Sequence, residues 1–553
     1  MATIVEPAAP RQQYNMRYVW AISLVAALGG LMFGYDWVVI SGAEPFYERF
    51  FDLKTASDKG WAMGSALIGC LIGAILSGSL SDKFGRKWLL VLSAVVFVVS
   101  SIGTGLIDTF LAFNLWRMAG GVAIGLASNL SPMYIAEIAP AAVRGRLVAM
   151  NQFTIVIGIL LAQGVNYGIA DYGARLDRKA VADHAGRNGT ALNAQAVAED
   201  LAWQVPQDQR APLVAEFARL AALRGGTLNF DAVEELAKQL NAKRIAERLD
   251  KIAAHRDAVE VAGRGLISWN VAPGWRWMFG VTAVPAGLFF LLMFFVPESP
   301  RWLVKNGRPD RARTVLARIG GGQYADREVA NVQETLVGEI EKVNFKDLFE
   351  PRMFKILTIG VVLAVLQQWC GMNVIFYYAA KIFQAAGSSV NDALFNIVII
   401  GLVNLVFTVI AINSVDRFGR RILMFIGFAG LAAIHALIGA SYYFEQSGTY
   451  ILFLALAAIG IYALSLAPVT WVILSEIFPN RIRGAAMSVS VFSLWTACFI
   501  LTYTYPLLAE NLGTAYTFWI YGAICAGGLV FTARNVAETK GKTLEEIEKE
   551  LVD

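Results

Sequence analysis

Long apolar runs separated by short polar loops fill most of the chain. Twelve runs can be marked, and about 20 apolar residues are enough to cross a bilayer core of about 30 Å. Two longer hydrophilic stretches, 171–270 and 297–350, interrupt the series. The pattern therefore predicts an all-α membrane protein with twelve transmembrane helices, at roughly 18–40, 60–80, 88–107, 110–132, 147–170, 274–296, 354–384, 392–414, 421–443, 449–475, 484–507 and 514–534.

Composition supports a membrane protein. The 553 residues are 56% hydrophobic and 16% charged, against about a quarter charged in soluble proteins. A net charge of +4 is too small to indicate nucleic acid. All four cysteines lie inside apolar runs, without CxxC or Cys/His spacing, so we expect no disulfide, metal or cofactor. They are Cys70, Cys370, Cys498 and Cys525.

Two sequence segments occur twice. "GSLSDKFGRKWLL" (78–90) returns as "NSVDRFGRRILMF" (413–425), and "MYIAEIAPAAVRGRLVAM" (133–150) returns as "VILSEIFPNRIRGAAMSV" (472–489). The repeats predict two similar six-span halves, an arrangement typical of transporters whose substrate site lies between the halves.

These features divide the chain into six parts. Helical periodicity at 211–226 and 231–262 predicts an α-helical insert, and amphipathic stretches at 308–320 and 327–343 predict short helices in the second hydrophilic region. The predicted parts are 1–170 (spans 1–5), 171–270 (insert), 271–296 (span 6), 297–350 (helical linker), 351–535 (spans 7–12) and 536–553 (tail).

Basic residues predict the orientation. Lysines and arginines gather in the short loops after even-numbered spans, and such loops face the cytoplasm. Both termini and the linker are then cytoplasmic, in a multi-pass protein of the cell membrane. The insert lies outside, and its sequence indicates no particular partner.

The repeated loops carry matched charges. Each repeat has an acidic and a basic residue around a glycine, Gly85 or Gly419, and a Glu seven residues before an Arg. Carboxylates and guanidiniums pair strongly when bidentate, so we predict a cytoplasmic gate; alternatively, the basic loops fix only the topology. The gate residues are Asp82, Arg86, Glu137, Arg144, Asp416, Arg420, Glu476 and Arg483.

Span 7 holds three amides, Gln367, Gln368 and Asn373, in apolar surroundings. Amides supply both a donor and an acceptor to a sugar hydroxyl. One straight helix does not gather all three, but Gly371 permits a local bend. Trp471 in span 10 can stack on a pyranose ring. The alternative is hydrogen bonding between helices by the amides and core packing by Trp471.

Asp36 lies in the first apolar run. A charged aspartate at the centre of a spanning helix costs about 2.5–3.5 kcal/mol, so a partner is expected, and Arg117 in span 4 is the candidate. Gly121 and Gly125 would let neighbouring helices approach closely. Two interpretations remain open: a permanent ion pair, or a carboxylate that takes a proton from outside and releases it inside. His435 in span 9 is interpreted as a packed or hydrogen-bonded residue rather than a proton relay.

Seven motifs in order resemble the sugar porter family of the major facilitator superfamily, and within it the bacterial xylose–proton symporters and the glucose facilitators. They are "FGYD" (33–36), "SDKFGRK" (81–87), "SPMYIAEIAPAAVRGR" (131–146), "VPESPRWL" (296–303), "QQWCGMNVIFYY" (367–378), "VDRFGRR" (415–421) and "SEIFPNRIRG" (475–484).

The resemblance implies two pseudo-symmetric bundles that carry a monosaccharide by alternating access. It assigns Glu298 and Arg301 to the cytoplasmic gate, and proton coupling to Asp36 and Arg117, because symporters have Asp where facilitators usually have Asn. Positions that match sugar contacts or aromatic residues of the family's cavity are Gln152, Gln367, Gln368, Asn373, Asn404, Trp471, Phe33, Tyr377 and Tyr462.

Two positions depart from the symporter pattern. Leu494 stands where a polar amide is expected in span 11, and Thr282 where an acidic residue is expected in span 6.

Together, the motifs and the resemblance predict a sugar transporter with proton symport. The alternatives are a sugar uniporter or a transporter-like sugar sensor. An enzyme is not expected, since Walker A, HExxH and GxSxG patterns are missing.

Overall fold

The computed structural model describes residues 14–140, 143–188, 268–338, 348–385, 388–444, 448–478 and 483–540, with Ala215 and Arg219. Within these residues, twelve spans are long and apolar enough to cross a membrane, as predicted. The first five are α1 (Met16–Phe50), α2 (Ala56–Phe84), α3 (Arg86–Leu106), α4 (Phe110–Ile138) and α5 (Arg144–Asn188).

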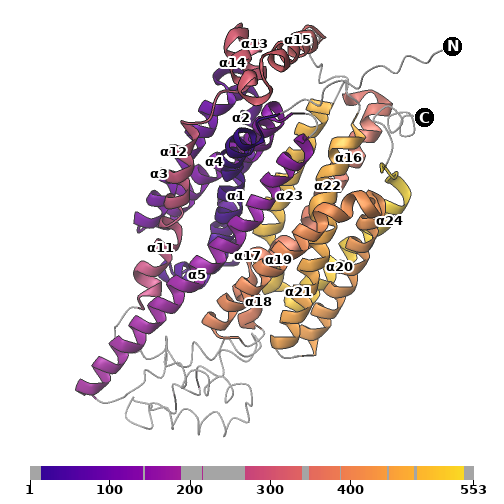
Figure 1. The fold of residues 1–553 in the computed structure, drawn as a ribbon. Helices are drawn as coiled ribbons and strands as arrows, with labels where there is room; N and C mark the ends of the chain where they lie inside the picture. The colour runs from indigo at the N-terminus through magenta and orange to yellow at the C-terminus, as the bar shows by residue number, and fades with distance from the viewer. Residues whose placement is uncertain are drawn as a thin grey trace, which may run out of the picture.

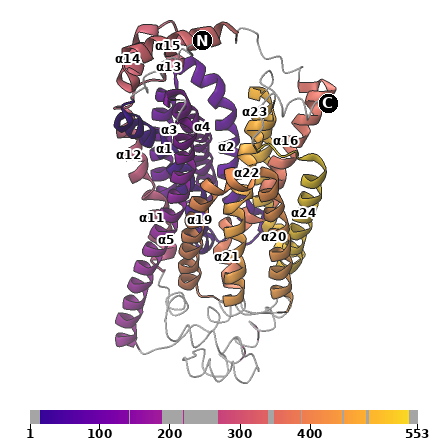
Figure 2. The ribbon, with the colours of Figure 1, turned by 45° about the vertical axis from the view of Figure 1, so that its right-hand side comes forward.

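The first half is completed by span 6, and the second half holds spans 7 to 12. Span 6 consists of η1 (Asn270–Gly274), α11 (Trp275–Gly280) and α12 (Ala283–Met293). The second half comprises α16 (Pro351–Trp369), α17 (Met372–Tyr377), α18 (Ala379–Ala385), α19 (Val390–Phe418), α20 (Arg420–Tyr443), α21 (Gly448–Leu464), α22 (Leu466–Ile477), α23 (Arg483–Asn511) and α24 (Thr514–Asn535). The two halves stand side by side (Figure 2) and meet where α2 packs on α23 and α5 on α19.

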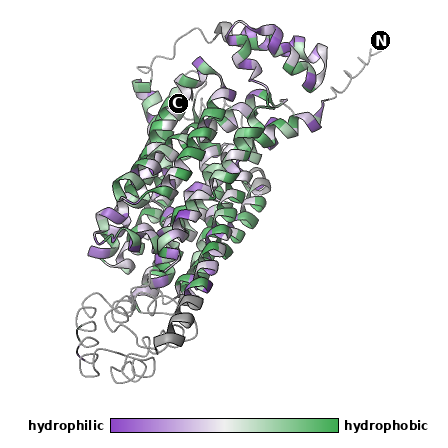
Figure 3. Ribbon diagram, turned by 90° about the vertical axis from the view of Figure 1, so that its left-hand side faces the viewer, coloured by the Kyte–Doolittle hydropathy of each residue, from purple (hydrophilic) through white to green (hydrophobic). Residues whose placement is uncertain are grey.

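Hydrophobic residues, green in Figure 3, run along the helices of the bundle, and many large apolar side chains are exposed. Phe295, Leu106 and Val284 are among the most exposed. An apolar surface this extensive would be a liability in water, and it suits a lipid surrounding.

Three spans that the sequence shows as continuous runs are broken. Span 7 stops at Cys370 and restarts at Met372, span 10 is interrupted at Ser465, and span 6 between α11 and α12. Proline explains the last two, because its ring clashes with the carbonyl four residues earlier: Pro468 faces Leu464, where α21 ends, and Pro285 faces Val281.

The predicted close approach at Gly121 and Gly125 is confirmed, and the neighbour is α2. A Cβ on Gly121 would lie 1.9 Å from the carbonyl oxygen of Ala66, and one on Gly125 would lie 2.2 Å from that of Cys70. Larger residues would force α2 and α4 apart.

The linker forms three helices, α13 (Pro300–Lys305), α14 (Pro309–Gly320) and α15 (Gly322–Gly338), at one end of the first half (Figure 1). There the Asn15 backbone N–H donates to the Ile319 carbonyl at 2.7 Å, just before α1 begins. We call the end of the molecule that carries these linker helices the basic end, and the opposite end of the molecule the far end. α5 runs on to Asn188. Apart from Ala215 and Arg219, the helices predicted at 211–226 and 231–262 lie outside the described residues.

Candidate functional site

The three amides of span 7 form one buried chain of hydrogen bonds. Gln367 Nε2 donates to the Tyr462 hydroxyl at 2.7 Å, Gln368 Nε2 donates to Gln367 Oε1 at 2.5 Å, and Asn373 Nδ2 donates to Gln368 Oε1. The chain therefore joins α16, α17 and α21 in the second half.

The break between α16 and α17 brings the amides together. Gly371 has φ 82°, a left-handed conformation that glycine adopts without strain. Gln367 and Gln368 lie in the last turn of α16, and Asn373 lies in the first turn of α17. The turn at Gly371 therefore places the three amides within bonding reach, as the sequence predicts.

Aromatic rings from both halves lie beside the amides. Trp37 of α1 packs on Phe376 (ring centroids 5.2 Å apart) and on Tyr377 (5.8 Å), both in α17. Phe33 meets Trp495 of α23 at 5.7 Å. This aromatic wall links the first half to the short helix that carries Asn373.

The other predicted sugar contacts are spread over three helices. Asn404 of α19 is buried, Gln152 of α5 is partly buried, and Trp471 of α22 is 39% exposed. Trp471 is therefore not a fully buried core residue. Leu494, at the departing position, is buried in α23.

Asp36 and Arg117 are in contact. Arg117 Nη1 lies 2.6 Å from Asp36 Oδ1, and the two residues are 4% and 5% exposed. Among the described residues Asp36 Oδ2 has no hydrogen-bond partner, so one carboxylate oxygen is available to a proton while the other holds the arginine. Thr282, also buried, occupies the junction of α11 and α12.

At the basic end, the first repeat forms a charge network. Arg86 pairs with Asp82 at 3.2 Å and with Glu137 at 3.1 Å. Ser299 Oγ donates to Glu137 Oε2, and Glu298 Oε1 accepts the backbone N–H groups of Arg86 and Lys87 at 3.1 Å each. The carboxylate of Glu298 thus caps the start of α3.

The second repeat forms the same network. Arg420 pairs with Glu476 at 3.0 Å, Thr539 Oγ1 donates to Glu476 Oε2 at 2.5 Å, and Glu538 accepts the backbone N–H groups of Arg420 and Arg421 at 2.9 and 3.0 Å. Ser299 and Thr539 therefore correspond, as do Glu298 and Glu538. The sequence analysis did not assign Glu538 to the gate. The signal for it is that "AET" (537–539) follows the second half as "PES" (297–299) follows the first.

These pairs join helices of the same half. Arg144 is exposed at the start of α5, Arg301 lies in α13, and the side chains of Asp416 and Arg483 lie outside the described set. Within the described side chains, the pairs between predicted gate residues thus brace each half separately.

The two capping carboxylates differ in pKa. Burial raises the pKa of Glu298 above 4.5 despite its backbone donors. For Glu538, burial works in the same direction, but backbone N–H groups outweigh it and its pKa lies below 4.5.

The halves are joined by polar contacts at the far end, which the sequence did not predict. Lys381 Nζ of α18 lies 2.9 Å from Glu44 and 2.5 Å from Glu48, both on α1. Ser57 and Tyr503 share a hydrogen bond of 2.9 Å. Glu44 is 1% exposed, so Lys381 compensates a buried charge.

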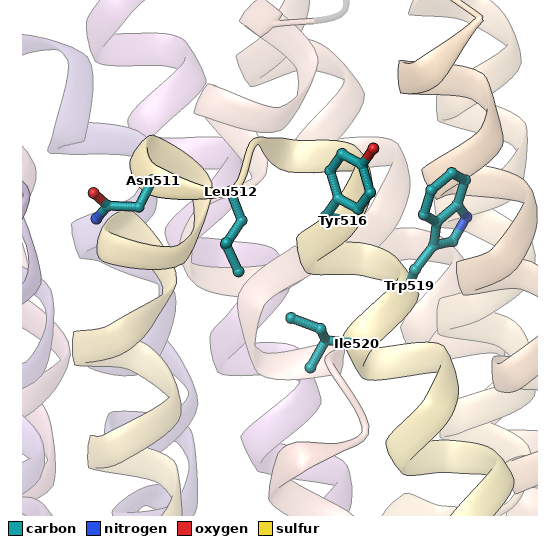
Figure 4. Close-up of a pocket in the computed structure, with 5 residues that line it drawn as sticks. All are labelled: Asn511, Leu512, Tyr516, Trp519 and Ile520. Carbon is teal, nitrogen blue, oxygen red and sulfur yellow. The ribbon is translucent and has the colours of Figure 1, made fainter.

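A cavity of about 520 Å³ lies away from the amides, where α23 passes into α24 (Figure 4). Asn511, Leu512, Tyr516, Trp519 and Ile520 line it. It includes none of the predicted site residues.

Comparisons with known proteins agree over nearly the full length. A family model described as "Sugar (and other) transporter" matches residues 22–182 and 260–551. The D-xylose-proton symporter of Escherichia coli is 34% identical, covering 97% of this chain and 96% of the relative. The arabinose-proton symporter of Bacillus subtilis is 34% identical, covering 99% and 98%. An inward-open structure of the E. coli xylose transporter XylE matches with a TM-score of 0.71 and 33% identity, covering 96% of this chain and 100% of that one.

Proposed function

The chain belongs to the sugar transporter family, and from that premise we propose that it carries a monosaccharide across the membrane in symport with a proton. The amide chain from Gln367 to Asn373 carries the proposal. Its members bond to one another and to Tyr462. A sugar hydroxyl can replace each of these partners without leaving a buried polar group unpaired, which would cost about 1–3 kcal/mol.

The path from proton to sugar is short. Trp37 follows Asp36 on α1 and packs on α17, the helix that carries Asn373. Neutralising Asp36 releases Arg117 and frees α1 to move against α17. The relatives named as proton symporters support this assignment.

In the proposed cycle the described conformation faces the cytoplasm. Lys381, Glu44 and Glu48 hold the far end closed, while the predicted gate pairs brace each half at the basic end. The positive-inside rule assigns the basic end and both termini to the cytoplasm of a cell membrane. The predicted gate residues, with Glu538, then keep each half rigid as the halves rock.

The proposal is tested by uptake of pentoses and hexoses into proteoliposomes, with and without a proton gradient. Symport predicts accumulation above the external concentration only with the gradient. Thr282, where an acidic residue was expected, is the observation that favours a uniporter, which would equilibrate a sugar regardless of the gradient. Binding without flux would indicate a sensor.

A further inference from the structure

His435 is a buried histidine with one specific contact. It lies in α20, is 0% exposed, and its Nε2 lies 2.7 Å from the carbonyl oxygen of Cys370. Cys370 is the residue at which α16 stops. His435, in span 9, thus contacts span 7 at the break that brings the three amides together.

The contact fixes the state of the ring. A helix that stops leaves its last carbonyls without intrahelical partners, and within a bilayer each unsatisfied group costs several kcal/mol. A carbonyl can only accept, so Nε2 carries the proton and donates it. The thiol of Cys525 approaches the same carbonyl at 3.6 Å.

Close packing holds the imidazole in place. A Cβ on Gly371 would lie 2.8 Å from Nε2. The ring also meets Phe518 at 5.7 Å and Tyr521 at 6.3 Å, both from α24. Among the described residues Nδ1 has no hydrogen-bond partner, so the described structure shows no group to which the ring could pass a proton.

We propose that His435 is a positioning residue for the sugar site. Its Nε2–H bond to Cys370 fixes the angle between α16 and α17, and so holds Gln367 and Gln368 in register with Asn373 across Gly371. The inference rests on the proposed function, since it assigns the amide chain to sugar binding.

The test compares two nearly isosteric replacements, His435→Gln and His435→Met, of which only glutamine keeps a donor. Ser441→Ala is the control, because Ser441 is buried in the same helix and, within the part of the chain that the structure describes, bonds to the Leu437 carbonyl alone, at 2.7 Å. Uptake of D-xylose, arabinose and D-glucose into proteoliposomes gives KM and maximal rate for the best substrate. Thermal unfolding in detergent is measured in parallel.

We expect His435→Met to raise KM about tenfold, because the buried Cys370 carbonyl then keeps only the weaker thiol donor of Cys525. Its maximal rate and uphill accumulation persist. His435→Gln recovers most of the affinity, and Ser441→Ala behaves as wild type. A methionine variant with wild-type KM, or a glutamine variant no better than methionine, overturns the proposal. Loss of uphill accumulation with exchange intact would overturn it in favour of a proton relay.

A measurement on the unmodified protein covers the case in which His435→Met does not fold. The ¹⁵N shifts of the His435 ring should show the proton on Nε2, and an Nδ1–H tautomer would overturn the inference. Failure of the proposed function is distinguishable, because wild-type vesicles would then take up none of the sugars.

Discussion

At the scale of single residues, the proposed sugar affinity rests on the amides of span 7. Gln368 is the middle member of the chain, with one bond to Gln367 and one to Asn373. Gln368→Ala should weaken sugar binding by about 1–3 kcal/mol, since a sugar hydroxyl loses its partner. Equilibrium binding of the transported sugar measures this. Gln384→Ala is the control, because among the described residues Gln384 bonds to Ala380 of its own helix alone. Equal affinity in both variants would mean that Gln368 serves in packing and not in sugar binding.

The opposite pKa shifts of the two capping carboxylates, Glu298 and Glu538, predict opposite effects of pH on the stability of the fold. The depressed pKa of Glu538 means that it stabilises the fold above pH 4.5, and this contribution is lost as the pH falls through its folded pKa. The raised pKa of Glu298 reverses the sign: its contribution is lost as the pH rises above 4.5 through its folded pKa.

Unfolding temperatures of wild type, Glu538→Gln and Glu298→Gln across the acid range test this. As the pH rises, the unfolding temperature of wild type should increase relative to that of Glu538→Gln. It should decrease relative to that of Glu298→Gln. Parallel curves for the two variants would contradict the assigned directions.

At the scale of helices, the spans could be predicted because apolar length and the charges between runs are local properties. The bend at Gly371 could also be predicted, since a glycine among clustered amides is a local signal. The contact between His435 and Cys370 could not, because residues 65 positions apart meet only through the packing of α20 on span 7. The contact between Lys381 and Glu48, which lie 333 positions apart and in different halves, could not be predicted for the same reason.

Hydrogen bonds join the two chain segments at which the insert between spans 5 and 6 begins and ends. Asp177, near the end of α5, accepts from Ser268 Oγ at 2.5 Å and from the Trp269 backbone N–H at 2.7 Å. Replacing residues 189–266 with a glycine–serine linker keeps these bonds, so we expect sugar uptake close to wild type. Loss of uptake in a variant that is folded and inserted would make the insert part of the transport path.

At the scale of the whole molecule, Lys381 joins the two halves at the far end. Its ammonium group lies 2.9 Å from Glu44 and 2.5 Å from Glu48. Lys381→Met should open the far end, because it leaves Glu44 buried without a cation. A cysteine at Ala43, which is buried beside Glu44 on α1, should then react faster with an impermeant thiol reagent.

Two further variants separate charge from position. Lys381→Arg keeps the cation and should label slowly. Lys54→Met removes a lysine at the same end that pairs with Asp52 at the surface, and it should also label slowly. A labelling rate unchanged by Lys381→Met would mean that apolar packing alone closes the far end.

In the proposed symport, Asp36 couples the proton to the sugar. Asp36→Asn keeps the size of the side chain and removes its titratable group, and it leaves Arg117 without a charged partner, which should lower stability. The direct measurement is sugar accumulation driven by a pH gradient, compared with counterflow at equal pH in the same vesicles. We expect the variant to lose uphill accumulation and to keep counterflow. A variant that still concentrates sugar in response to the gradient would contradict this role, and Asp36 would then serve only to pair with Arg117.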